Sequence, residues 1–308
     1  MTTRYYYHSS CLEHVNLPGH PERPDRLRAV EEALTNERFM MLERVEAPEA
    51  DPAWFELAHP AEYVKRVRKL IPEEGLAQID ADTSASPKSW EAVLHACGAA
   101  LDAVDAVFNK EADNAFAAIR PPGHHAEKTT AMGFCLINNI AVAARYAQKK
   151  HGAERVAIID FDVHHGNGTQ DIFWSDPSVM FASSHQMPLY PGTGALGETG
   201  SGNICNAPLR HGDGSQQFKE AFRTRILPAV DDFAPDLILV SAGFDAHFRD
   251  PLAGLELTAT DFDWVTGEIM DLANRHCDNR VVSLLEGGYD LRGLAESAAA
   301  HVNRLMTG

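Results

Sequence analysis

Four short segments of the sequence place ionisable side chains beside glycine, and each directly follows an apolar run typical of a β-strand. In open parallel α/β sheets, ligands bind beyond the carboxyl ends of the strands. One such segment would be an ordinary turn, whereas four of them predict a shared site. The segments are residues 120–125, 160–168, 242–247 and 286–289.

Asp162, His164 and Asp245 have the side chains of a metal site. Asp162 and His164 are two residues apart, so they point to the same side of an extended strand end. Asp245 follows a neighbouring strand and would supply a third ligand. Three protein ligands leave a coordination position for water, which is typical of catalytic zinc. Such a donor set would also accept iron(II), and an Asp-x-His pair alone occurs by chance in many chains.

Two histidines and a tyrosine could supply acid–base chemistry. His124 and His125 follow a Pro-Pro-Gly turn that can present both rings to one pocket, although alone they would be interpreted as surface histidines. Asp160 could hydrogen-bond one of them, which fixes the tautomer and raises the basicity. Tyr289 follows two glycines, and its phenol could stabilise negative charge on a carbonyl oxygen. A plainer interpretation is a tyrosine that only begins the last helix.

The elements that must position these residues alternate between strands and helices. Several apolar runs are continuous, as in residues 156–159, and a parallel sheet covered on both faces requires such strands. The alternation indicates βαβ units with right-handed crossovers. We expect one α/β domain over residues 1–308, because the chain contains no linker or repeat. The expected strands are residues 3–7, 115–119, 155–161, 178–183, 236–241 and 280–285.

Helical patterns lie between these strands. The clearest, residues 87–108, places apolar side chains on one face, with Ser86 as its expected N-cap. Thr260 is the expected N-cap of a later helix. Residues 184–214 contain seven glycines and little periodicity, and a long irregular segment in a compact domain is usually functional. The remaining expected helices are residues 24–35, 60–70, 138–150, 215–232, 261–276 and 289–305.

The composition excludes several classes of protein. The chain has 44 acidic and 27 basic residues, and its net charge of −17 argues against a nucleic-acid partner. Five widely spaced cysteines without a C-x-x-C motif argue against a disulfide framework and a thiolate zinc site. No apolar run approaches the ~20 residues of a membrane helix, and the first residues lack the apolar core of a signal peptide. We therefore expect a cytoplasmic protein without a membrane partner.

Taken in order along the chain, these motifs resemble those of the histone deacetylase superfamily. The resemblance extends from about His20 to Tyr289, and the combination is specific although no single motif is. Asn167 and the His-His-Gly before it resemble the class II branch. The motifs are H-P-E-R-P at 20–24, H-P-A-E-Y at 59–63, P-P-G-H-H at 121–125, G-F-C at 133–135, D-F-D-V-H-H-G-N-G at 160–168, P-G-T-G at 191–194, S-A-G-F-D at 241–245 and E-G-G-Y at 286–289.

The resemblance implies the arginase/deacetylase fold, an eight-stranded parallel sheet flanked by helices. It implies one zinc ion per chain, bound by Asp162, His164 and Asp245. The implied catalytic residues are His124, His125, Asp160, Asn167 and Tyr289. The implied rim and walls of a narrow acyl-lysine tunnel are Asp82, Gly133, Phe134, Tyr190 and Leu252.

The resemblance also implies one or two structural potassium ions, and it implies that Arg23 faces an internal channel for the acid product. The first potassium site would be built partly from carbonyl oxygens of Asp160, Asp162, His164, Ser183 and Ser184. The second would be formed by Phe173, Asp176, Val179 and Asn203.

Asn167 departs from part of the family pattern. Many class I members carry an aspartate at this position, behind the second histidine of the tandem pair. A neutral amide orients the ring of His125 but supports its protonated form less than a carboxylate would. We therefore expect a lower pKa for His125 than an aspartate would give it.

These observations predict a zinc-dependent amidohydrolase that removes acetyl or other acyl groups from lysine side chains in peptides or proteins by means of metal-activated water. An acetylpolyamine amidohydrolase with the same chemistry stays open. Leu252 stands where polyamine-selective relatives tend to place an acid, which favours acyl-lysine, whereas the negative net charge attracts polycations.

A binuclear manganese ureohydrolase of the arginase kind and a non-catalytic acyl-lysine binder fit the residues less well. The ureohydrolase needs additional bridging carboxylates, but Gly166 and His247 stand two residues after His164 and Asp245. The binder would not need Tyr289 and Asp245 together. The sequence makes no prediction of oligomeric state.

Overall fold

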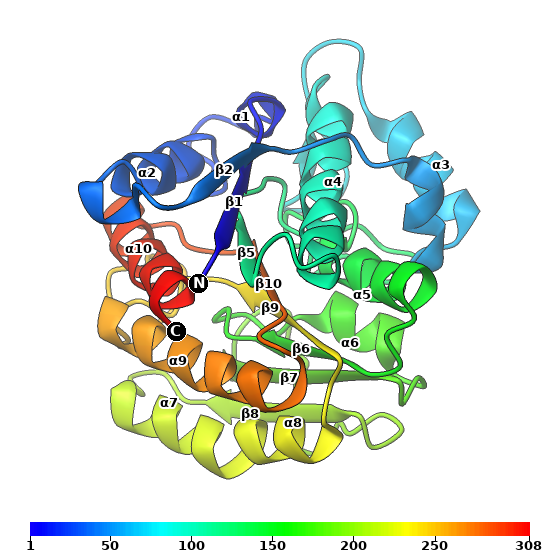
Figure 1. The fold of residues 1–308 in the computed structure, drawn as a ribbon. Coiled ribbons are helices and arrows are strands. Elements are labelled where there is room, and N and C mark those ends of the chain that lie inside the picture. The colour runs from blue at the N-terminus through cyan, green and yellow to red at the C-terminus, as the bar shows by residue number, and fades with distance from the viewer.

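A sheet of eight parallel strands runs through the centre of the molecule (Figure 1). The computed structural model describes all residues from 1 to 308. The strand order β2-β1-β5-β10-β9-β6-β7-β8 confirms the predicted α/β fold. The strands are β1 (Thr3–Tyr7), β2 (Glu43–Glu46), β5 (Asn114–Ala117), β6 (Val156–Asp160), β7 (Val179–Gln186), β8 (Ile204–Leu209), β9 (Leu237–Ala242) and β10 (Val281–Leu285).

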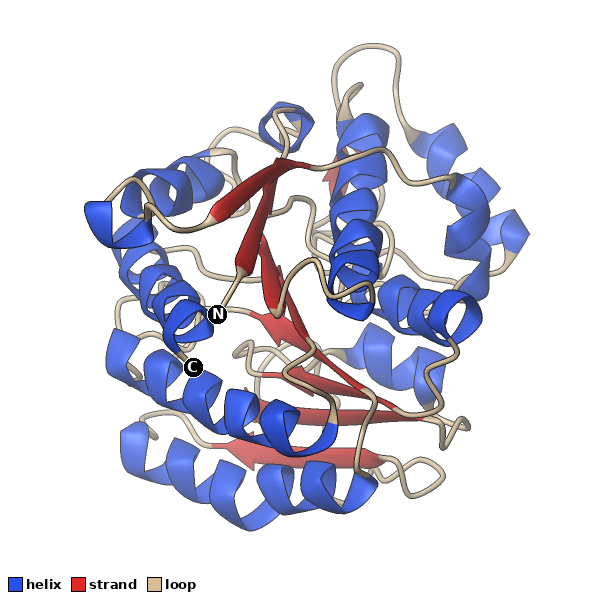
Figure 2. Cartoon of the chain, in the orientation of Figure 1, coloured by secondary structure: helices blue, strands red, loops and turns tan.

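Helices cover both faces of the sheet (Figure 2). A short antiparallel pair, β3 (Ala77–Gln78) and β4 (Ser84–Ala85), lies outside it, and a π-helical turn, Phe222–Ile226, joins α7 to α8. The α-helices are α1 (Ser10–Glu13), α2 (Asp25–Ala33), α3 (Ala61–Leu70), α4 (Ser89–Phe108), α5 (Asn139–His151), α6 (Asn167–Phe173), α7 (Ser215–Ala221), α8 (Leu227–Phe233), α9 (Ala259–His276) and α10 (Leu291–Thr307).

The continuous apolar strands follow from these two covered faces. Ala157 and Ile159 of β6 belong to a core of 42 buried residues, which also includes side chains of α2, α7, α8, α9 and α10. Val156 and Ile158 of the same strand belong to a second core of 40, which includes side chains of α3, α4, α5 and α6. Because successive side chains point to opposite faces, a strand between two equal cores has no polar side.

Two edge strands and two helix starts differ from the prediction. β2 and β8 were not expected, and residues 184–214, predicted to be irregular, contain β8 and the end of β7. α4 begins at Ser89 rather than after Ser86, whose backbone N–H donates to Ser89 Oγ. The N-cap of α9 is Thr258 rather than Thr260, because the carboxylate of Asp261 accepts the Thr258 backbone N–H at 3.0 Å.

The four segments singled out in the sequence meet at one edge of the sheet. β5, β10, β9 and β6 are neighbours at its centre, and their carboxyl ends lead into residues 120–125, 286–289, 242–247 and 160–168. The four segments therefore converge, as predicted, because their strands are neighbours in the sheet. Each helix of the fold is too short or too polar to cross a lipid bilayer.

Candidate active site

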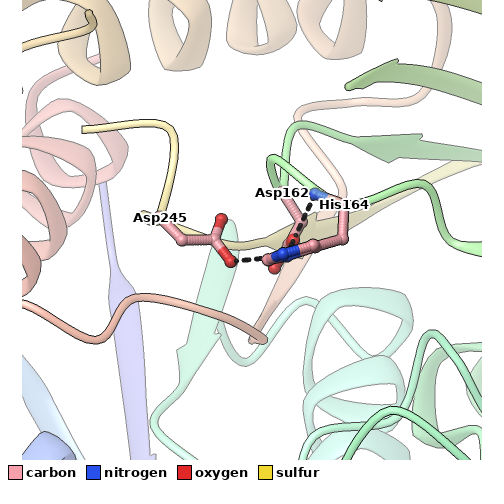
Figure 3. Close-up of side chains that lie close together, drawn as sticks. All are labelled: Asp162, His164 and Asp245. Carbon is pink, nitrogen blue, oxygen red and sulfur yellow. Dashed lines mark hydrogen bonds and ion pairs between the residues drawn. The ribbon is translucent and has the colours of Figure 1, made fainter. Parts of the chain in front are cut away.

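Asp162, His164 and Asp245 lie together beyond the carboxyl ends of β6 and β9 (Figure 3). His164 Nδ1 is 3.2 Å from Asp162 Oδ1 and 3.1 Å from Asp245 Oδ2. One ligand atom from each side chain lies within 4.8 Å of the others, and all three residues are buried. Two carboxylates and one imidazole form a donor set for a divalent transition metal.

Two glycines make room for these carboxylates. A Cβ on Gly243 would lie 2.0 Å from Asp162 Oδ2, and a Cβ on Gly287 would lie 2.0 Å from Asp245 Oδ2. Backbone N–H groups hold the carboxylates in place, because Gly287 donates to Asp162 Oδ2 and Val163 donates to Asp245 Oδ1, both at 2.8 Å. The chain thus builds an oriented ligand cradle, which fits a bound metal ion.

The electrostatics of the triad favour a cation. Burial lowers the pKa of His164, but the hydrogen-bonded carboxylates of Asp162 and Asp245 outweigh burial and raise this pKa to about 10. The negative field that holds a proton on the imidazole equally attracts a metal ion to the three side chains.

His125 presents an unprotonated ring nitrogen to the site. Its Nδ1 lies 2.8 Å from Asn167 Oδ1, and Asn167 Nδ2 donates to Glu127 Oε1 at 2.8 Å. The second contact fixes the amide orientation, so Asn167 accepts and His125 Nδ1 carries the hydrogen. Nε2 is then left as the acceptor of the ring.

The two adjacent histidines have opposite pKa shifts. His124 Nδ1 lies 3.0 Å from Asp160 Oδ2. Burial lowers the pKa of His124, but nearby carboxylates, first Asp160 and then Asp162, raise it to about 10. Burial and the charge of His124 hold the pKa of His125 well below its ordinary value. The pair therefore combines one charged and one neutral imidazole, an arrangement typical of acid–base sites.

A pocket of about 230 Å³ opens over these groups. The five residues predicted for the rim and walls of a tunnel all line this pocket, and so does Leu189, which sequence reasoning missed. A Cβ on Gly133 would lie 2.5 Å from the His125 ring, so only glycine fits that wall. The lining residues are Asp82, His125, Gly133, Phe134, His164, Leu189, Tyr190, Leu252 and Tyr289.

Two residues that sequence reasoning missed hold the segment carrying Tyr289. Asp250 Oδ2 accepts the backbone N–H of Tyr289 at 2.7 Å. The Arg26 guanidinium donates to Gly288 O at 2.7 Å and to Glu286 O, and it lies 4.9 Å from the centre of the Tyr289 ring. These contacts fix the backbone that leads into Tyr289.

Arg23 does not face an internal channel as expected. Its side chain is 48% exposed and lies near Asp25, at 3.6 Å. Arg26 is instead the fully buried arginine, because it lies on the inner face of α2 together with Val30, four residues later. That i, i+4 spacing was the available signal in the sequence.

A buried ion network supports Arg26 from behind. Glu22 accepts from Arg26 Nη1 at 3.2 Å and, through both oxygens, from Arg120. All three side chains are fully buried. Burial raises the pKa of Glu22, but the charge of Arg120 outweighs it, so this pKa lies well below its ordinary value. Loss of Glu22 would leave two buried cations without a counter-charge.

The first predicted potassium site has one observation in its favour. Ser184 Oγ is buried and has no hydrogen-bond partner. The neighbouring groups are occupied, since Ser183 Oγ lies 2.9 Å from His185 Nδ1 and Asp160 Oδ1 accepts the Asp162 N–H. An ion would supply a partner, although the buried hydroxyls of Thr3, Tyr5, Ser241 and Ser297 lack one as well.

The second predicted potassium site does not fit the residues present. The carbonyl oxygens of Phe173, Asp176 and Val179 converge on Asn203 Nδ2 at 2.9, 3.0 and 2.8 Å. Asn203 therefore offers hydrogens, not a side-chain oxygen, to the ring of carbonyls. Its backbone oxygen accepts the Phe181 N–H at 3.0 Å. As placed, Asn203 offers a cation no side-chain ligand, so this geometry gives the predicted second potassium site no support.

Comparisons with known proteins identify a family and agree with the fold. The histone deacetylase domain family matches residues 20–305. A probable deacetylase of Archaeoglobus fulgidus is 41% identical over 300 residues, which cover 95% of this chain and 83% of the relative. A histone deacetylase-like amidohydrolase of Pseudomonas aeruginosa is 38% identical over 310 residues, covering 93% and 81%. The crystal structure of the HDA15 HD domain aligns with a TM-score of 0.94 at 37% identity, over 99% of this chain and 88% of that one.

Proposed function

Because the chain belongs to the histone deacetylase family, we propose that it is a zinc-dependent hydrolase that removes acetyl or other acyl groups from lysine side chains in peptides or proteins. Residues 1–308 act as one catalytic domain in this proposal. The observation that carries it is a single pocket whose lining includes His125, Tyr289 and the metal-ligand candidate His164.

Asp162, His164 and Asp245 would hold the metal. When bound there, zinc lowers the pKa of a water molecule and polarises the carbonyl of the substrate amide. A structural potassium ion beside Ser184 would support the loop that carries these ligands.

The acid–base steps belong to His125. Its Nε2 accepts a proton from the attacking water, and the same atom then donates that proton to the leaving amine. Asn167 keeps the ring in the required tautomer throughout, because its carbonyl oxygen accepts the Nδ1 hydrogen. His124 stays charged beside Asp160 and stabilises negative charge as it develops nearby.

Tyr289 completes the site from the opposite side. Its hydroxyl donates to the carbonyl oxygen of the substrate as negative charge accumulates there. Phe134 and Tyr190 line the pocket and suit the aliphatic part of an acylated lysine, while Asp82 at the rim would accept a backbone N–H of the peptide.

An acetylated polyamine is the second candidate substrate, and the charge at the mouth of the pocket favours it. Burial raises the pKa of Tyr190, and the negative charges of Asp82 and Asp80 raise it further. The same field attracts a distal ammonium group. Leu252 argues for the peptide, since an acid in its place would pair with that ammonium.

The test compares two substrates on the zinc-loaded protein. Amine release from an acetyl-lysine peptide and from an acetylated diamine is measured at matched concentrations, with Asp245→Ala as the blank for contaminating activity. We expect kcat/KM to favour the peptide by about tenfold or more. Leu252→Glu should shift the ratio toward the diamine, whereas Leu196→Glu, an exposed leucine outside the pocket, should not.

Failure of the zinc-loaded protein to release amine from either substrate, beyond the Asp245→Ala blank, would refute hydrolysis of these amides. A preference for the diamine would support the same amide hydrolysis, but with acetylated polyamines rather than acyl-lysine peptides as the substrate class.

A further inference from the structure

The turn that joins α6 to β7 in Figure 1 packs against a buried side-chain amide, that of Asn203. The carbonyl oxygens of Phe173, Asp176 and Val179 point at Asn203 Nδ2 from three directions, all within 3.0 Å. Asn203 lies on the approach to β8 and is only 4% exposed. Rings of backbone carbonyls are the surroundings in which proteins bind potassium, because the oxygens replace the hydration shell of the ion. Here the centre of the ring is an N–H donor.

The other end of the amide fixes its orientation. Asn203 Oδ1 accepts from Ser201 N at 3.1 Å and from Ser201 Oγ at 2.9 Å. Rotating the amide by half a turn would place its oxygen against three carbonyl oxygens and its nitrogen against two donors. The hydrogen-bond network therefore allows one assignment only.

A fixed positive charge already lies beside this turn. The Arg145 guanidinium sits 4.7 Å from the centre of the Phe173 ring and pairs with the Asp176 carboxylate. Because Arg145 already neutralises this carboxylate, the turn offers no unpaired negative charge to a second cation. The local charge thus agrees with a neutral donor at the centre of the ring.

We propose that the Asn203 amide permanently takes the place of a second monovalent cation, so that this chain fixes the α6–β7 turn without one. Asn167, the first residue of α6, orients His125, and Phe173, the last, contributes a carbonyl to the ring. The amide therefore anchors the C-terminal end of the helix whose N-terminal end orients the catalytic base. Any potassium dependence of the protein then originates at the site beside Ser184 alone.

The proposal is tested first by converting the amide into an oxygen ligand. Asn203→Asp would surround the centre of the ring with oxygens only and so create a cation site. Thermal unfolding midpoints are measured between 1 and 100 mM KCl, with choline chloride keeping the ionic strength constant. We expect the midpoint of Asn203→Asp to rise by roughly 3 °C more than that of the wild type.

Asn206→Asp is the matched control. Asn206 belongs to β8, is equally buried, and donates to one amide oxygen and one carbonyl rather than to a ring. The Asn206→Asp variant shows how potassium changes the unfolding midpoint when a buried carboxylate has no such ring around it. If Asn203→Asp gains no more potassium dependence than the wild type or Asn206→Asp, the ring is not a latent cation site and the proposal fails.

The second measurement uses the wild-type protein, so its result does not depend on whether either variant folds. Crystals grown in rubidium chloride are examined by anomalous diffraction. We expect no rubidium at the carbonyls of Phe173, Asp176 and Val179, and an Asn203 side chain whose nitrogen faces all three. Rubidium bound there, with the amide turned away, would overturn the proposal.

Discussion

Replacing Gly287 by alanine should remove the metal from the protein with little change elsewhere. The added Cβ would lie 2.0 Å from Asp245 Oδ2 and 2.5 Å from Asp162 Oδ2, where ordinary contacts begin at 3.4 Å. The backbone of Gly287 does not have a positive φ, so alanine introduces no strain of its own. The perturbation therefore acts on two ligand carboxylates.

The size of the effect follows from these distances. The carboxylates must move by roughly 1 Å or more, whereas metal–ligand distances hold to about 0.2 Å. Even the loss of an outer hydrogen bond to a ligand typically costs 10–100-fold in metal affinity. Two displaced ligands should cost at least about 100-fold, which is about 3 kcal/mol of binding free energy.

Competition with a chromophoric chelator measures the zinc dissociation constant directly. Gly197→Ala is the control, because its Cβ would meet no atom within 4 Å and its φ is not positive. We expect wild-type affinity for the control and weak binding for Gly287→Ala. A zinc affinity of Gly287→Ala within about threefold of the wild type would show that the metal is not held between these carboxylates.

Three further predictions concern the tyrosine, the amide and a remote histidine. Tyr289→Phe should lower kcat by about 100-fold while zinc affinity is unchanged, and near-full activity in steady-state assays would remove the phenol from the mechanism. Asn167→Asp should move the acid limb of the kcat/KM profile to higher pH, because a carboxylate favours protonated His125; unchanged limbs would contradict the role of the amide. His301, buried between Thr266 and Ser283, has its pKa lowered by burial from 6.5 to about 3. Its neutral form is favoured in the folded state, so its contribution is complete above pH 6.5 and is lost as the pH falls toward 3. Urea unfolding between pH 7 and pH 4.5 measures this loss. The wild type should lose about 2.5 kcal/mol more stability over this range than His301→Gln does, and equal losses would refute this assignment.

The interior of the sheet was predictable because burial on both faces leaves a strong pattern. The observed β6 and β10 differ from the predicted strands by at most one residue at each end. The two edge strands left no such pattern. β2 has the sequence Glu-Arg-Val-Glu and is largely exposed, and β8 includes a proline, as edge strands tolerate. An edge strand needs a partner on one side only, so its sequence is weakly constrained.

The metal-ligand candidates were predictable for a different reason. They follow parallel strands, whose carboxyl ends all lie at one edge of the sheet, so a parallel sheet by itself places Asp162 and Asp245 at the same edge. The supporting contacts were not predictable in this way. Asp250 and Arg26 bind backbone groups around Tyr289. Every residue has such groups, so the sequence does not indicate which of them a side chain contacts. Asn203 was assigned to the turn where it lies, but the sequence could not show which end of its amide faces the carbonyls, and here it is the nitrogen.

The position of β10 has a consequence for how the protein is made. β10 pairs with β5 on one side and β9 on the other, and no other strand joins these two halves of the sheet. During synthesis, β5 and β9 each present a bare edge until residues 281–285 leave the ribosome, and bare edges invite pairing with other chains. Gly287, which positions two candidate ligands, arrives just behind them. The nascent chain thus stays vulnerable to aggregation, and unable to complete its candidate metal site, until residues 281–287 are translated.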